Sequence, residues 1–305
     1  MIAGRSKVDW IAVDWGTSNL RVWAMAAEGV IDFTSSPQGM GKLARSEFED
    51  VLVKLIAPWL GGGPMPVVAC GMVGSRQGWQ EAPYRSTPCT PVASGVLISV
   101  PTADPRLQML IAPGLKQLQP ADVMRGEETQ IAGALAMLPG FDGVICLPGT
   151  HSKWAHISAG EVISFQTYLT GELFALLSEQ SVLRHGMAEG GWQDDAFDQA
   201  VAEGLSRPEK IAARLFTLRA EGLISGLTAP AARARLSGLL IGIELAAAKP
   251  YWLGRQVVLV GSPALSVNYA RALASQGVLV DQMDATACTI SGLAMARGAL
   301  QKAAE

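Results

Sequence analysis

The sequence has few of the side chains that hold metals or cross-link small folds. Its 305 residues include three histidines and four cysteines, and no two cysteines form a C-x-x-C pair. This spacing suits neither a zinc site nor a disulfide framework, and the histidines are not spaced for a zinc hydrolase. Cys70 and Cys146 lie in apolar, strand-like segments. We therefore expect them to be buried, reduced thiols.

Charge is also scarce. Charged residues make up 17% of the chain, the net charge is −3 and no basic stripe is present, which argues against a nucleic-acid partner. An apolar fraction of 49% excludes a disordered chain. The longest apolar helical stretch, Leu236–Ala248, is too short to cross a bilayer and contains Glu244. No signal peptide is evident, so we expect a cytoplasmic protein of about two domains, without membrane partners.

The usual nucleotide-binding fingerprints are missing. No G-x-x-x-x-G-K-[ST] sequence occurs, which argues against a P-loop. Residues 39–44 fit G-x-G-x-x-A, but they follow the third strand of a predicted meander, and the next strand ends without the acid that a ribose requires. We interpret this match as accidental, although its flexible backbone could border a ligand.

Strand and helix patterns alternate along the chain, which predicts an α/β fold of mixed sheets flanked by helices. The breaker Pro139-Gly140 suggests a boundary, giving domains of residues 1–140 and 141–305, with the last helix a candidate for packing at a hinge. Expected strands cover residues 8–14, 20–26, 30–33, 66–72, 96–100, 107–112, 143–148, 153–157, 161–167, 257–260 and 278–280. Expected helices cover residues 46–60, 127–138, 172–183, 194–205, 209–224, 230–248, 264–275 and 289–303.

One pattern occurs twice. Residues 13–33 and 145–165 each read as three strands, with Gly16-Thr17 matching Gly149-Thr150 at the first turn. The segment EGVIDF of the first copy matches GEVISF of the second. This similarity predicts an internal duplication, one copy in each domain.

The paired turns suggest phosphate binding. Glycine at a tight turn lets backbone N–H groups approach an anion, and nearby hydroxyl and amide groups add donors. One such turn would be an ordinary hairpin, but two, one per domain, favour phosphates held across a central cleft. Asp14, at the end of the first strand, is placed to hold a Mg²⁺-bound water. The candidate nucleotide-binding residues are Gly16, Thr17, Ser18, Asn19, Gly149, Thr150, Ser152, Lys153, Gly261 and Ser262.

Three of these candidates need separate comment. Gly261-Ser262 forms a further strand–turn–helix in which glycine leaves room for a flat base, although many α/β proteins use such a turn as a plain connection. Lys153 is either a point charge for phosphate or a solvated turn residue.

Two further segments carry candidate chemistry. Glu127 and Glu128 begin a largely apolar helix, where acids either complement the helix dipole or supply a general base for a hydroxyl. The glycine-rich loop 71–84 contains Arg76, which could bind a carboxylate bidentately, and Trp79, which could form a flat apolar wall.

These blocks together resemble a known family. The segments DWGTSNLRVW (14–23), CGMVGSRQGWQEAPY (70–84), MRGEETQIAGAL (124–135), LPGTHSKW (147–154), LTGELFALL (169–177) and GSPAL (261–265) resemble the 2-dehydro-3-deoxygalactonokinases. That family belongs to the actin-like ATPase superfamily, together with hexokinases and acetate kinases. The resemblance implies two actin-like domains that close on a cleft.

The resemblance also implies an activity. An enzyme of this kind transfers the ATP γ-phosphoryl group to the terminal hydroxyl of 2-dehydro-3-deoxy-D-galactonate in galactonate breakdown, with Mg²⁺. It implies a phosphate motif at residues 14–17, a second at 148–153 and an adenosine motif around Gly261. The superfamily's catalytic acid, usually Asp, corresponds to Glu128, with Glu127 as the competing candidate. The substrate candidates are Arg76, Gln77, Trp79, Arg85 and Arg125. Arg76, alone or with Arg125 or Arg85, is expected to bind the carboxylate of the sugar acid.

Other functions stay open at this stage. The chain could phosphorylate an epimeric keto-deoxy sugar acid, such as a gluconate-derived one. It could be an actin-like ATPase that activates a partner without a sugar substrate, or a non-catalytic sugar-binding module. The sequence does not decide between a monomer and a homo-oligomer.

Overall fold

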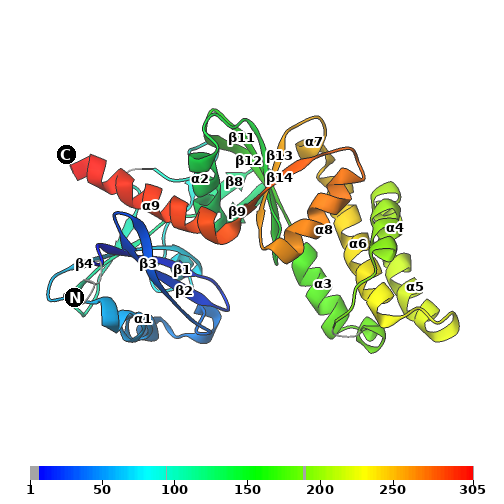
Figure 1. Ribbon diagram of the computed structural model, residues 1–305, viewed down its shortest axis with the longest axis horizontal. Coiled ribbons are helices and arrows are strands. Elements are labelled where there is room, and N and C mark those ends of the chain that lie inside the picture. Colours follow the sequence, from blue (N-terminus) through cyan, green and yellow to red (C-terminus); the bar gives the residue numbers. More distant parts are fainter. Residues whose placement is uncertain (1–6, 94, 188–189, 305) are drawn as a thin grey trace, which may run out of the picture. The chain divides into compact units, whose positions relative to one another are not determined.

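The computed structural model describes residues 7–93, 95–187 and 190–304, which contacts divide into two units (Figure 1). Unit 1 comprises the chain up to Phe141, Ala159–Ile163 and the chain from Ala285 onward. Unit 2 comprises Asp142–Ser158 and Ser164–Asp284. The expected division placed residues 285–305 in the second domain, whereas the contacts of this last helix assign it to unit 1. The cleft between domains stays a prediction.

The elements follow the alternation expected from the sequence. The strands are β1 (Trp10–Trp15), β2 (Leu20–Ala26), β3 (Gly29–Ser36), β4 (Met65–Gly71), β5 (Arg85–Ser86), β6 (Ile98–Val100), β7 (Leu107–Ile111), β8 (Leu115–Leu118), β9 (Ala121–Met124), β10 (Gly143–Leu147), β11 (Ser152–Ser158), β12 (Glu161–Tyr168), β13 (Val257–Gly261) and β14 (Val280–Asp284). The helices are α1 (Phe48–Ile56), α2 (Glu127–Met137), α3 (Thr170–Glu179), α4 (Asp194–Ser206), α5 (Ile211–Ile224), α6 (Ala229–Ala247), α7 (Lys249–Trp252), α8 (Pro263–Ala274) and α9 (Ala285–Ala304).

Unit 1 is built on a sheet of order β3-β2-β1-β4-β7-β6. Strands β1, β2 and β3 form an antiparallel meander, and β1, β4 and β7 run parallel. Side chains alternate between the two faces of a strand, and in β1 the residues on both faces are buried. Ile11 and Val13 pack with α1, whereas Trp10 and Ala12 pack with Leu293 of α9. The sheet therefore lies between these two helices.

Unit 2 repeats this plan. Its sheet has the order β12-β11-β10-β13-β14, with β10, β11 and β12 as the meander and β13 parallel to β10. Val144 and Cys146 of β10 pack with residues of α6, α7 and α8. The predicted α/β class, with mixed sheets flanked by helices, is confirmed.

A small sheet of order β5-β8-β9 escaped the sequence analysis. Its strands have two to four residues, which is too short for an alternation pattern to be recognised. The expected strand at residues 278–280 is in fact β14, Val280–Asp284, whose polar, largely exposed side chains hide its strand character. Among the described residues, no helix combines the length and apolar character needed to cross a membrane.

Helices α2 and α9 contact each other through their backbones. A Cβ added to Gly133 would lie 1.8 Å from the Cys288 carbonyl oxygen, and one added to Gly292 would lie 1.9 Å from the Thr129 carbonyl oxygen. No larger side chain fits such a crossing, so glycine is required at both positions. The crossing fixes the first turn of α2, which carries Glu127 and Glu128.

Candidate active site

Unit 1 brings three predicted acids together where β1, β4 and α2 meet. Asp14 on β1 lies beside Cys70 on β4, and the next residue, Gly71, has φ +90°. A Cβ on Gly71 would lie 2.8 Å from the Trp15 carbonyl oxygen and 3.4 Å from Asp14 Oδ1. Gly126, with φ +106°, comes within 3.4 Å of the Gly71 Cα when given a Cβ. Both residues have a positive φ, which glycine adopts readily, and neither has a side chain. They therefore let the start of α2 lie beside Asp14.

Glu128 is completely buried. Its Oε2 accepts a hydrogen bond from the Gly126 N–H at 2.7 Å, and its Oε1 accepts one from the Thr129 hydroxyl at 3.1 Å. Burial, reinforced by the neighbouring Glu127 carboxylate, raises the pKa of Glu128 to about 8. The carboxyl is therefore mainly protonated at neutral pH, and in this conformation no substrate reaches it.

Glu127 is the accessible member of the pair. It is half-buried, and its Oε2 accepts a hydrogen bond from the Arg125 backbone N–H at 3.0 Å. As the first residue of α2, it lies at the positive end of the helix dipole, which favours a carboxylate. The structure thus separates two residues that the sequence left as alternatives: one is covered and the other is open to solvent.

Asp14 has one carboxylate oxygen engaged and one available. Its Oδ2 accepts a hydrogen bond from Arg21, the cross-strand neighbour on β2, at 3.2 Å. Its Oδ1 has no hydrogen-bond partner in the part of the chain that the structure describes. Burial raises the pKa of Asp14, partly offset by Arg21. The described residues contain no group of three or more His, Cys, Asp or Glu side chains able to hold a metal. A single carboxylate fits a Mg²⁺ ion that is bound mainly through phosphate oxygens and water.

The buried carboxyl predicts a pH dependence of stability. The folded chain keeps the Glu128 proton between the ordinary pKa of 4.5 and about 8, whereas the unfolded chain releases it. The contribution of Glu128 to the free energy of unfolding is therefore greatest below pH 4.5 and declines, by at most about 1.4 kcal/mol per pH unit, up to pH 8. Glu128→Gln removes this decline, so urea unfolding should show the variant gaining stability relative to wild type between pH 5.5 and 8. Exposed Glu179→Gln is the control, and a parallel pH dependence of Glu128→Gln and wild type would contradict the burial argument.

The first glycine–threonine turn, residues 16–19, presents free donors. The Gly16 N–H closes the turn on the Asn19 carbonyl oxygen at 2.9 Å, and the side chains of Thr17, Ser18 and Asn19 are exposed. Within the described ranges, the N–H groups of Thr17 and Ser18 have no acceptor. Such a group of outward N–H and hydroxyl donors suits an anion.

The segment 39–41, which the sequence analysis treated as an accidental fingerprint, supports this turn. The Met40 N–H donates to the Gly16 carbonyl oxygen, and the Gly41 N–H donates to that of Thr17, both at 2.9 Å. A Cβ on Gly39 would lie 2.3 Å from the Thr17 carbonyl oxygen. These glycines therefore permit close backbone contact rather than binding a dinucleotide.

The second turn has the same support. The Glu172 N–H, in the first turn of α3, donates to the Thr150 carbonyl oxygen at 2.9 Å, as Gly41 does to Thr17. A Cβ on Gly171 would lie 2.3 Å from the Gly149 carbonyl oxygen. Gly39 approaches the first turn in the same way, since its Cβ would lie 2.3 Å from the Thr17 carbonyl oxygen. Each unit thus carries a Gly-Thr turn that a glycine packs against and whose threonine carbonyl oxygen accepts a backbone N–H from a later segment. This shared construction supports the duplication inferred from the sequence.

The prediction that the turn at residues 16–19 binds phosphate can be tested at Gly39, the glycine that packs against it. Substituting Gly39 should weaken nucleotide binding. In Gly39→Ala the new methyl group meets backbone atoms of residues 17–19, so the turn must shift. We expect the KM for Mg·ATP to rise about tenfold, equivalent to about 1.4 kcal/mol. Gly61→Ala, where a Cβ meets nothing within 4 Å, is the matched control. Steady-state kinetics that show equal KM values for the two variants would refute this role of Gly39.

A buried carboxylate near the second turn is hydrogen-bonded to residues of three other elements. Glu244 of α6 accepts hydrogen bonds from Trp154 Nε1 and the Tyr269 hydroxyl, both at 2.7 Å, and from the Thr170 hydroxyl. The Tyr269 hydroxyl also lies 2.8 Å from Ser152 Oγ. Burial raises the pKa of Glu244. Ser152 is thus occupied inside this network instead of facing a ligand, in contrast to its predicted donor role.

The other predicted residues of unit 2 divide between the turn and the interior. Thr150 and His151 are exposed, and His151 pairs with Glu172 at 2.5 Å. Lys153 is buried on β11, so it is not the solvated turn residue that the sequence left as one alternative. Gly261 lies near the turn, because its Cβ would come 3.5 Å from Pro148 Cδ. Ser262 is the residue preceding α8.

A cavity of about 190 Å³ opens beside the second turn. Gly149 and Gly171 border it, and Leu240, Leu265 and Asn268 line its interior. Leu265 and Asn268 belong to α8, which begins just after Gly261. A mainly apolar cavity with a few polar groups suits a flat organic ring.

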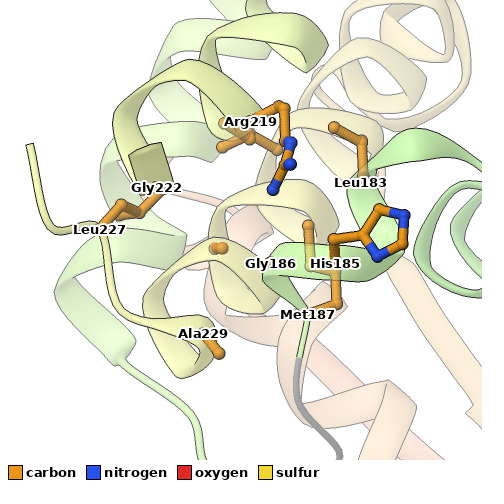
Figure 2. Close-up of a pocket in the computed structure, with 10 residues that line it drawn as sticks. Leu183, His185, Gly186, Met187, Arg219, Gly222, Leu227 and Ala229 are labelled. Carbon is orange, nitrogen blue, oxygen red and sulfur yellow. The ribbon is translucent and has the colours of Figure 1, made fainter. Parts of the chain in front are cut away.

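Unit 2 also has a cavity of about 320 Å³ among its helices, which shares no lining residue with the first. It lies between the 3₁₀ turn Val182–Gly186, α5 and the start of α6. Figure 2 shows His185 and Arg219 among its lining residues. The sequence analysis assigned no role to this region.

The substrate candidates separate by burial. Arg76 has a side chain 82% exposed and pairs with Glu81 at 3.7 Å, and Gln77 is exposed. Trp79 packs against Trp15 and Phe48 and also lines an open groove, so its role as a flat ligand wall stays a prediction. The last two candidates are arginines. Arg85 donates a hydrogen bond to the Thr90 carbonyl oxygen at 2.8 Å. Arg125 is buried close to the Glu127–Glu128 pair.

Comparison with known proteins identifies the family. A family model described as 2-keto-3-deoxy-galactonokinase matches residues 14–296, which include both glycine–threonine turns and the acidic pair. The chain belongs to this family. It is 39% identical over 299 residues to a Rhizobium meliloti (strain 1021) protein named "Probable 2-dehydro-3-deoxygalactonokinase", covering 95% of this chain and 97% of the relative.

A second curated relative and a solved structure support the assignment. The 2-dehydro-3-deoxygalactonokinase of Escherichia coli (strain K12) is 35% identical over 272 residues, covering 88% of this chain and 90% of the relative. A crystal structure of a related protein from Sinorhizobium meliloti superposes with a TM-score of 0.89 at 39% identity, covering 95% and 98% of the two chains. Membership confirms the predicted family and favours a sugar-acid kinase over a partner-activating ATPase or a non-catalytic module.

Proposed function

We propose that this protein transfers the γ-phosphoryl group of ATP to the terminal hydroxyl of 2-dehydro-3-deoxy-D-galactonate, giving the 6-phosphate and ADP. The main observation behind the proposal is that Asp14, near the end of β1, lies close to Glu127, the first residue of α2, in a chain of the 2-keto-3-deoxy-galactonokinase family. Such a reaction uses ATP as a substrate, which the cytoplasm supplies.

Phosphoryl transfer requires alignment and charge neutralisation more than covalent chemistry from the protein. We assign phosphate binding to the donors of each glycine–threonine turn, and the adenine ring to the 190 Å³ cavity beside Gly149. Asp14 is the residue that would hold Mg²⁺ through its free Oδ1. When bound, Mg²⁺ neutralises phosphate charge.

Glu127 is the group that would orient the substrate hydroxyl and accept its proton. It is exposed enough to touch a ligand, and its carboxylate is held by the Arg125 N–H. Glu128, the base expected from the sequence, is covered by protein and mainly protonated at neutral pH. Its hydrogen bond to the Gly126 N–H instead fixes the turn that presents Glu127.

The product distinguishes this function from its alternatives. Purified protein is incubated with Mg·ATP and either the galactonate-derived keto acid or its gluconate-derived epimer, and the product is examined by ³¹P NMR. We expect a phosphomonoester coupled to the terminal methylene protons of the galactonate-derived acid. Faster formation from the epimer would reassign the substrate, and inorganic phosphate as the sole product with either acid would contradict a kinase.

A further inference from the structure

Arg125 is a buried cation with donors left over. Its Nη2 donates to the Ala82 carbonyl oxygen at 2.8 Å, and its guanidinium lies over the Tyr84 ring, 4.2 Å from the centroid. The arginine fits because Gly74 has no side chain, since a Cβ there would lie 2.9 Å from Nη1. Loop 71–84 thus encloses a positive charge next to the Glu127–Glu128 pair.

Two nitrogens of this guanidinium lack acceptors. Nε and Nη1 are buried without a hydrogen-bond partner among the residues described, in a side chain only 9% exposed. The hydroxyl of Ser75, which follows Gly74, is likewise buried and unpartnered in a residue 6% exposed. Each buried donor left unpaired costs about 1–3 kcal/mol, and more when it is charged. Ser75 follows Gly74, the residue that makes room for Nη1, and unpaired buried donors beside this short segment indicate that an acceptor from outside the chain belongs there.

We infer that Arg125 and Ser75 bind the carboxylate of the sugar acid and make the enzyme selective for acids over neutral sugars. This inference rests on the proposed function. A carboxylate supplies the acceptor oxygens that the guanidinium and the hydroxyl lack. The Arg125 backbone N–H also holds Glu127, so one short segment would position both the carboxylate and the reacting hydroxyl of the substrate. Nε and Nη1 are buried in this conformation, so binding of the acid requires loop 71–84 to move, which the hydrogen-exchange measurement below tests.

Arg76, the first of the three arginines that the sequence offered as carboxylate ligands, lacks these properties. Its head group is in solvent and already pairs with Glu81, so binding a second carboxylate would add little. Arg125 is desolvated and stacked on an aromatic ring, where an ion pair with a ligand is screened far less. The two arginines therefore offer opposite predictions for the same measurement.

The test compares the keto acid with its neutral C1 amide, using kcat/KM for phosphorylation by each variant. Wild type should prefer the acid about 100-fold, since hydrogen bonds to a charged group each contribute about 1.5–3 kcal/mol. Arg125→Met should reduce the preference below tenfold, Arg125→Lys should restore part of it, and Ser75→Ala should raise the KM for the acid severalfold. Arg297→Met, which removes another arginine stacked on an aromatic ring (5.2 Å from Trp10), should keep the wild-type preference.

A binding readout that does not depend on turnover completes the test. Without ATP, the keto acid should alter hydrogen exchange of residues 72–80 in wild type and in Arg297→Met, but not in Arg125→Met. If Arg125→Met does not fold, as judged by circular dichroism, Arg125→Lys and Ser75→Ala carry the comparison. The inference is overturned if Arg125→Met or, in its place, Arg125→Lys prefers the acid as strongly as wild type does, or if Arg76→Met abolishes the preference. Wild type that phosphorylates acid and amide equally contradicts this inference alone, whereas wild type that phosphorylates neither contradicts the proposed function.

Discussion

Replacing Glu127 by Gln should lower kcat for the keto acid by about 10²- to 10⁴-fold, the usual contribution of a positioned general base. The amide keeps an oxygen that can accept the Arg125 N–H, so the fold of the turn is retained while the proton acceptor is lost. The KM for ATP should change little, because Glu127 lies outside both glycine–threonine turns. Steady-state kinetics with each substrate varied in turn would measure this.

The matched variant is Glu128→Gln. At neutral pH the Glu128 carboxyl is mainly protonated, so a neutral amide of the same shape resembles its ordinary state. We expect a loss of less than about tenfold in kcat, from the altered hydrogen bond to Gly126. The opposite order, with Glu128→Gln inactive and Glu127→Gln active, would return the base to the residue that the sequence favoured.

Glu244→Leu should strongly destabilise the protein and impair ATP use. The change removes the acceptor shared by the indole N–H of Trp154 and the hydroxyls of Thr170 and Tyr269. Tyr269 keeps Ser152 as a partner, so two donors are left unpaired in the interior. Each costs about 1–3 kcal/mol, so a loss of at least about 2 kcal/mol in the free energy of unfolding is expected. The KM for ATP should rise more than the KM for the keto acid, because Thr170 and Tyr269 border the 190 Å³ cavity.

Two comparisons isolate the carboxylate. Glu244→Gln keeps one acceptor and should recover much of the stability, whereas Glu179→Leu, an exposed acid at the end of α3, should change stability by less than about 0.5 kcal/mol. Urea unfolding followed by circular dichroism gives the free energies. A Glu244→Leu variant as stable as Glu179→Leu would show that the network contributes little.

Much of the fold could be predicted from local patterns. The strand β2 was predicted with its observed bounds, and α2 within one residue, because apolar alternation and the Pro139-Gly140 breaker are properties of adjacent residues. The repeated Gly-Thr turn also predicted that both sheets begin with a three-stranded meander, which the strand orders confirm.

The contacts of individual side chains could not be predicted in this way. The glycine-rich loop around Trp79 indicated a ligand wall but not the packing of this residue against Trp15 and Phe48, which come from distant segments. The match of Gly39 to a dinucleotide fingerprint was interpreted as accidental, and its actual partner, the turn at Thr17, lies more than twenty residues earlier, where a local pattern does not reach. Glu244 did carry a signal, since a lone acid in the apolar stretch 236–248 must have buried partners.

The choice between the two glutamates shows the same limit. Glu127 and Glu128 are adjacent, so successive positions on α2 point in different directions. Glu128 lies near Cys70 at the end of β4 and also accepts a hydrogen bond from the adjacent Thr129 hydroxyl. The neighbour on β4 cannot be read from the sequence of the segment itself.

Release of ADP by the wild-type protein, followed with and without the galactonate-derived keto acid, tests the central claim most directly. A kinase with these turns and this acidic pair should release ADP only when the acid is present, with one ADP for each molecule of phosphorylated acid. Release of ADP at the same rate in the absence of the acid would contradict the account.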